Sequence, residues 1–188
     1  MGNHVSDNQT NLYFIALIPH QELREQIKAL KEEMKERFNA ARALRSPAHI
    51  TLQMPFRRSE EDEPYLIDTL QEFAVGQKKF MVKLSGFDCF SPRVIFVKVI
   101  EHEPIIAVHA QLKQFLTDKM DFKEKVITQY IHPHMTLASR DLSVAAFHSA
   151  WQEFERREFE ASFISRSLFL LKHNGNFWEI YREFLFKK

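Results

Sequence analysis

Hydrophobic and polar positions form recognisable blocks along the chain, and the first blocks predict a strand followed by a long helix. Residues 12–18 are all apolar and end at Pro19, which indicates a buried strand. Next, apolar side chains recur every three or four residues, as in an amphipathic helix: Leu23, Ile27, Leu30, Met34, Phe38 and Ala41. The other face carries charges that predict a solvated surface: Lys28, Lys31, Glu32, Lys35 and Glu36.

The rest of the chain continues as short strands and helices. Strands are expected at 49–54 (ending at Pro55), 80–84, 94–100 and 134–138, and helices at 62–73, 105–116 and 144–154. The C-terminal segment indicates one hairpin, with arms at 163–172 and 177–186 around Asn174-Gly175, a strong signal for a tight turn. No Gly- or Ser-rich linker divides this order, so we expect two α+β lobes that share one cleft.

Composition narrows the class of protein. Hydrophobic residues make up 45% of the 188 residues, enough for a sizeable core. With 26 basic and 25 acidic residues the net charge is +1, which argues against coating of long nucleic acid but allows binding of a nucleotide or one RNA end. Four glycines leave no Gly-rich phosphate loop. The single cysteine, Cys89, excludes an internal disulfide and suits the reducing cytoplasm, where we expect this protein.

The N-terminal residues look different from the rest of the chain. Residues 1–11 are mainly polar and lack the apolar core of a signal peptide, and no apolar run in the chain is long enough to span a membrane. The start of the chain matches a short, permissive myristoylation pattern, but a flexible terminus is the favoured interpretation. We therefore expect a flexible segment at 1–11, a single bilobed domain at 12–188 and no membrane partner.

One short motif occurs twice, about 85 residues apart. His49-Ile50-Thr51-Leu52 and His134-Met135-Thr136-Leu137 are both His-x-Thr-Leu, and each follows closely after a proline. In a strand, residues i and i+2 point to the same face, so each His projects beside its Thr while the apolar residues point into the core. Two such strands facing across a cleft would bring two imidazoles and two hydroxyls into one volume.

Paired imidazoles and hydroxyls suit phosphoryl transfer. Imidazole titrates near a pH of about 6.5, so one ring can act as a general base while the other, protonated, acts as a general acid. The hydroxyls of Thr51 and Thr136 can donate hydrogen bonds to phosphate oxygens on which negative charge develops. A lone strand histidine is more often structural, but the duplication favours a catalytic interpretation of His49 and His134.

The paired motifs resemble those of the 2H phosphoesterase superfamily, which includes the bacterial 2′-5′ RNA ligase (LigT-like) proteins and RNA 2′,3′-cyclic phosphodiesterases. Residues 12–19 resemble the family's first strand and helix start, and 131–138 resemble its second motif, so the resemblance covers nearly the whole chain. It implies an α+β fold with two pseudo-symmetric lobes of antiparallel sheet and outer helices around a central cleft.

The resemblance also implies an activity. The expected enzyme needs no cofactor or metal and hydrolyses 2′,3′-cyclic phosphate ends of RNA or nucleotides to 2′-phosphates. By resemblance, His134 deprotonates water and His49 protonates the leaving 3′ oxygen, while Thr51 and Thr136 bind the phosphate; the near symmetry of the motifs leaves the acid and base assignment open. The expected partner is an RNA end or cyclic nucleotide bound by a monomer, and 2′-5′ strand joining would be the reverse reaction.

Several other side chains are candidates for contacts with the base or the phosphate of a substrate. Phe56 follows the first motif strand at the expected cleft rim, where it could stack on a base, although packing into the core is an equal alternative. Tyr13 lies in the first strand. Arg140 stands six residues after His134, one place beyond the basic residue common in the family, and His132 can share the face of His134. Arg57 and Arg58 could attract an anionic substrate, although exposed loop charges are the default interpretation.

Three alternatives stay open. The chain could be a non-catalytic RNA-end or nucleotide-binding module of the same fold, although a binder has no need of two titrating groups. It could act on another cyclic phosphate, such as an ADP-ribose cyclic phosphate. A metal site on His132, His134 and His49 is disfavoured, because no Asp, Glu or Cys lies beside either motif to complete a ligand set.

Overall fold

The computed structural model describes residues 10–187. Most of the segment for which flexibility is expected, and the whole myristoylation pattern, therefore lie outside the described residues. Thr10 and Asn11 are described, and they correct that expectation because both already belong to the first strand. None of the helices within 10–187 combines the length and the apolar character that crossing a membrane requires.

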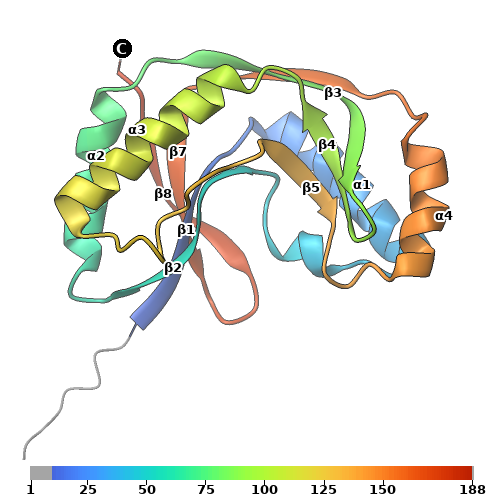
Figure 1. Cartoon of the computed structure of the whole chain (residues 1–188), viewed down its shortest axis with the longest axis horizontal. Coiled ribbons are helices and arrows are strands. Elements are labelled where there is room, and N and C mark those ends of the chain that lie inside the picture. The colour runs from blue at the N-terminus through green and yellow to red at the C-terminus, as the bar shows by residue number, and fades with distance from the viewer. Residues whose placement is uncertain (1–9, 188) are drawn as a thin grey trace, which may run out of the picture.

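Two four-stranded antiparallel sheets form the framework of the protein, as the family resemblance implies. The first sheet has the order β2-β1-β7-β8, with β1 (Thr10–Leu17), β2 (Ile50–Ser59), β7 (Ser167–His173) and β8 (Trp178–Leu185). The second sheet has the order β5-β4-β3-β6, with β3 (Phe80–Phe90), β4 (Val94–Val99), β5 (His134–Ala138) and β6 (Glu160–Ser165). Together the sheets curve into an open arch (Figure 1).

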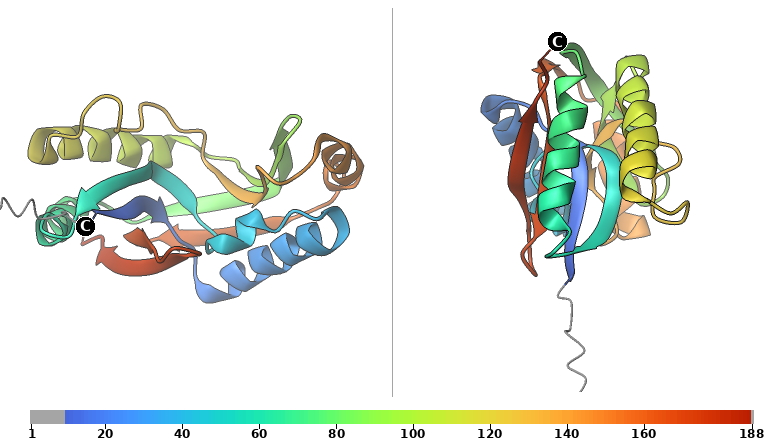
Figure 2. Two further views of the ribbon diagram at one scale, coloured as in Figure 1. Left: turned by 90° about the horizontal axis from the view of Figure 1, so that it is seen from below. Right: turned by 90° about the vertical axis from the view of Figure 1, so that its left-hand side faces the viewer.

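Four α-helices pack against these two sheets: α1 (Gln21–Phe38), α2 (Glu63–Val75), α3 (Glu103–Met120) and α4 (Val144–Phe154). Helices α2 and α3 contact the first sheet, whereas α1 and α4 contact the second. In the left view of Figure 2, α3 lies above the strands and α1 below them. Because α1 follows a strand of the first sheet but packs on β5, and α3 follows β4 but packs on β2, the two lobes are interlocked.

One apolar core runs through both lobes. A single cluster of buried side chains includes Ile15 and Leu52 of the first sheet together with Val97 and Met135 of the second. A smaller cluster on the other face of the first sheet joins Phe14, Ala16, Ile18 and Leu171. The shared core supports the expectation of one domain over 12–188, which stays a prediction for unfolding experiments.

The C-terminal hairpin is confirmed only in its second half. The turn at Asn174-Gly175 joins β7 to β8, and Gly175 has the positive φ (102°) that such turns favour. The expected arm at 163–172 is instead two strands in different sheets, because β6 pairs with β3 and β7 pairs with β1 on either side of Arg166. Both strands are rich in apolar residues, and that pattern does not specify which sheet a strand joins.

Strand β2 does not end at Pro55, as the sequence suggests, but continues through it to Ser59. The register with β1 shifts between the Tyr13–Phe56 and Ile15–Gln53 pairs, which places an extra residue of β2 at Met54-Pro55. Proline is tolerated there because β2 is an edge strand. On its outer side β2 has no neighbouring strand, so the missing N–H of Pro55 costs no hydrogen bond between strands there. The bulge changes the direction of the side chains that follow the first motif.

Candidate active site

The two motifs meet at the facing edges of the two sheets. His49 stands immediately before β2, and His134 is the first residue of β5; β2 and β5 are edge strands that contact each other. The second and fourth residues of each motif are fully buried, namely Ile50, Leu52, Met135 and Leu137. Each His and each Thr is only partly buried. The alternation expected from the motif is therefore present in both strands.

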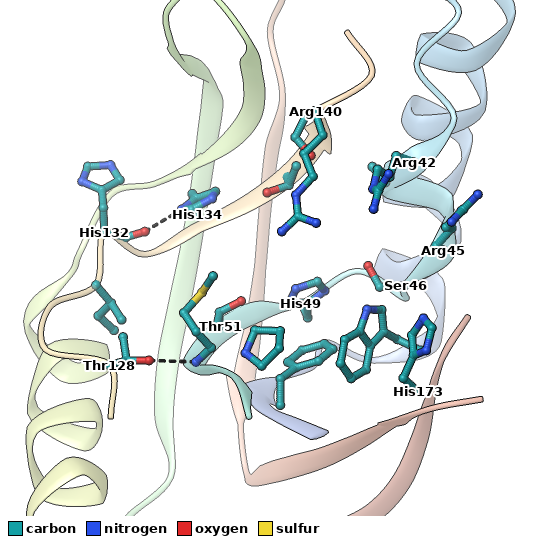
Figure 3. Close-up of a pocket in the computed structure, with 18 of the residues that line it drawn as sticks. Arg42, Arg45, Ser46, His49, Thr51, Thr128, His132, His134, Arg140 and His173 are labelled. Carbon is teal, nitrogen blue, oxygen red and sulfur yellow. Dashed lines mark hydrogen bonds between the residues drawn. The ribbon is translucent and has the colours of Figure 1, made fainter. Parts of the chain in front are cut away.

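All four motif side chains line one pocket of about 370 Å³, which we call the central pocket (Figure 3). His49 and Thr51 reach it from the first sheet, and His134 and Thr136 reach it from the second. Within residues 10–187, neither threonine hydroxyl makes a hydrogen bond to a protein group. Both hydroxyls are thus available to a ligand in the pocket.

Both imidazoles are oriented by the same local hydrogen bond. Nδ1 of His49 lies 2.8 Å from the carbonyl oxygen of Pro47, and Nδ1 of His134 lies 2.6 Å from that of His132. A carbonyl oxygen only accepts, so in each ring Nδ1 carries the proton and donates it. Nε2 of each ring is then the atom that can accept or donate a proton in the pocket.

Both histidines are held neutral in the free protein, although to different extents. Burial, followed by the positive charge of Lys31, lowers the pKa of His49 to about 4, against the opposing hydrogen bond to Pro47. Burial also lowers the pKa of His134, with the carbonyl of His132 opposing it and the charge of His132 adding to it. His49 is therefore the weaker base of the pair.

Lys31 is the unexpected cation beside His49, and its position corrects the prediction of a solvated helix face. Its side chain is 3% exposed, and Nζ donates to the carbonyl oxygen of Ser46 at 3.0 Å. In the part of the chain that the structure describes it forms no ion pair, and burial lowers its pKa to about 8. Lys31 lies four residues after Ile27 and three before Met34, so helical periodicity already places it on the apolar face.

Three arginines give the central pocket a positive character. Arg42 and Arg45 come from the 3₁₀ helix η1 (Arg42–Arg45), and Arg140 comes from the loop after β5. Among the described residues that line the pocket there is no Asp or Glu. An anionic ligand is therefore favoured over a cationic one.

The arginines suggested by sequence, Arg57 and Arg58, do not line the central pocket. The guanidinium of Arg58 lies 4.3 Å from the centre of the Phe122 ring and donates to the carbonyl oxygen of Met120. The sequence did not indicate Arg42 and Arg45, which do line the pocket, because η1 lies outside both motifs and its basic residues resemble ordinary surface charges.

Of the four weaker candidates, the structure brings Arg140 and His132 to the pocket and removes Phe56 and Tyr13. Phe56 is 3% exposed and packs edge-on against Phe122, so it cannot stack on a base. The bulge in β2 explains this, because it leaves Met54 and Pro55 at the pocket and turns Phe56 into the core. Tyr13 is fully buried and donates its hydroxyl proton to Glu63.

An aromatic wall packs beside His49, and two of its members, His173 and Trp178, were not indicated by the sequence. Phe14 lies 4.9 Å from the His49 ring and 4.7 Å from the Trp178 ring, measured between ring centres, and His173 lies 4.8 Å from Trp178. Strands β1, β7 and β8 place these side chains together. Across the pocket, the loop after α3 contributes Thr128, whose hydroxyl accepts from the backbone N–H of Met54, and the highly exposed Tyr130.

The metal alternative was tested on the donor groups present. Residues 10–187 contain no cluster of three or more His, Cys, Asp or Glu side chains arranged to hold a metal ion. His132 is 6.2 Å from His134 between ring centres and packs edge-on against His102 at 4.9 Å. His132 therefore belongs to an aromatic cluster beside the second motif.

Comparisons with known proteins agree with this geometry. A family model described as the 2′-5′ RNA ligase superfamily matches residues 19–177. A relative from Halalkalibacterium halodurans, provisionally named a phosphoesterase, is 24% identical over 92% of this chain and 95% of its own length. A similarly named relative from Geobacillus kaustophilus is 25% identical over 92% and 95%. The solved structure of E. coli LigT complexed with 3′-AMP has 18% identity and a TM-score of 0.69, covering 96% of this chain and 100% of that one.

Proposed function

The chain belongs to the 2′-5′ RNA ligase superfamily, and on that premise we propose that it is a phosphodiesterase that opens 2′,3′-cyclic phosphates to 2′-phosphates. The observation that carries this proposal is the pair of imidazoles, each with Nδ1 bonded to a carbonyl and Nε2 free, in one pocket with two unbonded threonine hydroxyls. That arrangement provides one proton acceptor, one proton donor and two phosphate ligands.

In the proposed reaction, a water molecule attacks phosphorus while His134 takes its proton through Nε2. The bond between phosphorus and the 3′ oxygen breaks, and Nε2 of His49 donates a proton to that oxygen. The 2′ oxygen stays bonded to phosphorus, so the product is a 2′-phosphate with a free 3′ hydroxyl. No step needs a metal or a cofactor. Strand joining to a 2′-5′ linkage would use the same proton transfers in the same direction, with a 5′ hydroxyl in place of water, and is therefore not the reverse of hydrolysis.

The different surroundings of the two histidines support this division of roles. Burial and Lys31 make protonated His49 the stronger acid, which suits proton donation to an alkoxide-like leaving oxygen. His134 keeps the higher proton affinity and suits removal of a proton from water. A bound phosphate carries the negative charge that favours protonation of one ring.

The phosphate-binding role belongs to Thr51 and Thr136 in this proposal, with Arg140 and His132 nearby in the pocket. The solved complex of E. coli LigT with 3′-AMP supports a nucleotide phosphate as the ligand class. We propose that the protein works as a monomer on RNA ends or nucleotides in the cytoplasm.

The test is hydrolysis by purified protein, with EDTA present, of 2′,3′-cyclic nucleotides, RNA with a cyclic phosphate end, and an ADP-ribose cyclic phosphate. Phosphorus NMR of the product identifies a 2′- or a 3′-phosphate. We expect conversion to 2′-phosphates. Binding of all these compounds without turnover would show a nucleotide-binding module instead. If EDTA abolished turnover and zinc restored it, the metal alternative would be favoured.

A further inference from the structure

The central pocket holds more positive charge than one cyclic phosphate requires. Two histidines and two threonines already provide the groups that a single phosphate needs, yet Arg42, Arg45 and Arg140 also line the pocket. Within residues 10–187 none of these three guanidinium groups forms an ion pair or a hydrogen bond to a carboxylate. Elsewhere the protein does pair arginines, as Arg37 and Arg157 do with Glu33.

Asp141 joins the two segments that carry these arginines. One oxygen of its carboxylate accepts from the backbone N–H groups of Ala41 and Arg42, both at 2.8 Å. The loop after β5 is thereby bound to the start of η1, although the two segments are about 100 residues apart in sequence. Asp141 uses one carboxylate oxygen for these bonds, and among the described residues it forms no ion pair with the neighbouring guanidinium groups.

The backbone at Arg140 is also unusual. Its φ is 53°, in the left-handed region that a non-glycine residue seldom adopts and that costs free energy. Figure 3 shows the guanidinium of Arg140 directed into the pocket towards His49, with Arg42 beside it and Arg45 further from the histidine pair. All three lie on the same side of the pair, away from Thr128.

We propose that Arg42 and Arg140 form a second anion subsite, which binds the 5′-phosphate of the nucleotide whose 2′,3′-cyclic phosphate lies between His49 and His134. Arg45 is at the edge of this subsite and extends its positive charge. The inference rests on the proposed function and narrows its substrate class. The preferred substrate is an RNA end or a 5′-phosphorylated nucleotide, and a cyclic nucleotide with a free 5′ hydroxyl is a poor one.

The chemistry of the groups supports a phosphate as the occupant. Guanidinium binds phosphate through paired, charge-assisted hydrogen bonds, and two arginines on one oxyanion form a common phosphate site. The scissile phosphate is contacted from β2 and β5, so the arginines beyond the end of β5 remain for a second group on the same ligand. The two anions would thus be bound by different segments of the chain.

The experiment compares kcat/KM for adenosine 2′,3′-cyclic phosphate, for the same compound with a 5′-phosphate, and for a dinucleotide that ends in the cyclic phosphate. A hydrogen bond between charged groups changes binding by a factor of about ten or more, so we expect at least about tenfold preference for both compounds with the 5′ group. Equal rates on the 5′-phosphate and the dinucleotide indicate recognition of the phosphate itself, and a dinucleotide advantage alone indicates contacts to the upstream nucleoside.

Substitutions at Arg42 test whether the preference for substrates with a 5′-phosphate depends on this arginine. R42A and the more conservative R42Q each remove one of the two arginines of the subsite and should lower the ratio between the 5′-phosphorylated and 5′-hydroxyl substrates. R57A is the matched control, because Arg57 is an exposed arginine of β2 outside the pocket, and it should keep the wild-type ratio. Circular dichroism of each variant checks that the fold is intact.

The outcomes separate this inference from the proposed function. Two results would refute the subsite: similar kcat/KM for all three compounds, or a ratio between 5′-phosphorylated and 5′-hydroxyl substrates that is unchanged in folded R42A and R42Q. Neither result would contradict the proposed phosphodiesterase activity. If no compound is hydrolysed, the proposed function fails, and calorimetric binding of adenosine 2′-phosphate against adenosine 2′,5′-bisphosphate still tests the subsite. There the bisphosphate should bind at least about tenfold more tightly to the wild type, and this advantage should be smaller in R42A, which keeps only Arg140 of the two subsite arginines.

Discussion

The two motif regions share a sequence and a local geometry but not an environment. Each histidine precedes its threonine by two residues, and each donates Nδ1–H to the carbonyl of the residue two positions before it. Around His49 the neighbours are Phe14 and the buried cation Lys31. Around His134 they are His132 and the rings of Phe90 and Phe96, with no buried lysine among the causes of its pKa shift.

This difference shows how a duplicated motif can serve two roles. General acid–base catalysis needs one group that gives a proton and one that takes it, and identical surroundings would give both rings the same proton affinity. The interlocked helices supply the asymmetry, because α1 packs on β5 of the second sheet and yet brings Lys31 beside His49 of the first motif.

Removing either imidazole is expected to have the largest effect. H49A and H134A each delete a proton-transfer partner and should lower kcat by about 10² to 10⁴, as is typical of general acid–base groups. The double variant should lose far less than the product of the two effects, because the rings act as a unit. H148A, an exposed histidine of α4, is the control in the same steady-state assay. A folded single variant with wild-type turnover would refute the catalytic role of that histidine.

The buried charge of Lys31 should appear in the pH dependence of stability. Its pKa is about 8 in the folded protein and lies near 10.5 without burial, so between these values the unfolded chain binds more protons. Rising pH therefore stabilises the fold through this group, by about 2 kcal/mol from about pH 7.5 to about pH 9.5. Denaturant unfolding of the wild type against K31M isolates the contribution. An identical pH dependence in both proteins would mean that Lys31 titrates normally.

The two threonines test the phosphate-binding half of each motif. T51A and T136A should each lower kcat/KM by about tenfold, because each removes one hydrogen bond to a charged oxygen. T51S and T136S keep the hydroxyl and should retain most of the activity. Stability should change little, since the hydroxyls face the pocket and not the core. Equal losses in the Ala and Ser variants would point to packing of the threonine methyl group instead.

The smallest expected effect is on the proton affinity of His49. K31M removes a positive charge that opposes protonation, so the pKa of His49 should rise from about 4 towards its ordinary value. Titration of the ring by NMR measures the change directly. K35M alters an exposed lysine of the same helix and should leave the pKa of His49 where it is. The pH–rate profile should be bell-shaped in the wild type, and the limb that reports His49 should move to higher pH in K31M.

The chain's local patterns were sufficient to predict much of the fold. The four long helices, the strand at 134–138 and the turn at Asn174-Gly175 are confirmed. The pairing of each motif histidine with its threonine on one face is confirmed as well, because it follows from the two-residue period of a strand. The family and the α+β fold were indicated by the same two motifs.

The sequence was least informative where the burial of a side chain or the pairing of a strand depends on a segment far away in the chain. Lys31 was assigned to solvent because it is charged, but its place in the helix buries it against the 46–49 segment. The sequence left Phe56 open between the cleft and the core, and a bulge in an edge strand turns it into the core. The arms of the expected hairpin separated at Arg166, because apolar alternation does not encode the partner strand.

The candidates for the chemistry, two His-x-Thr-Leu segments, can be recognised in the sequence alone, because a repeated motif is visible without knowledge of which segments pack together. Only the tertiary structure decided their surroundings, namely Lys31 behind His49, the aromatic wall from Phe14 and Trp178, and the arginines of η1 beside Arg140. The difference arises from the separation along the sequence over which each effect acts. Strand and helix periods act between residues a few positions apart, whereas the meeting of two sheet edges depends on how interlocked helices bury one shared core.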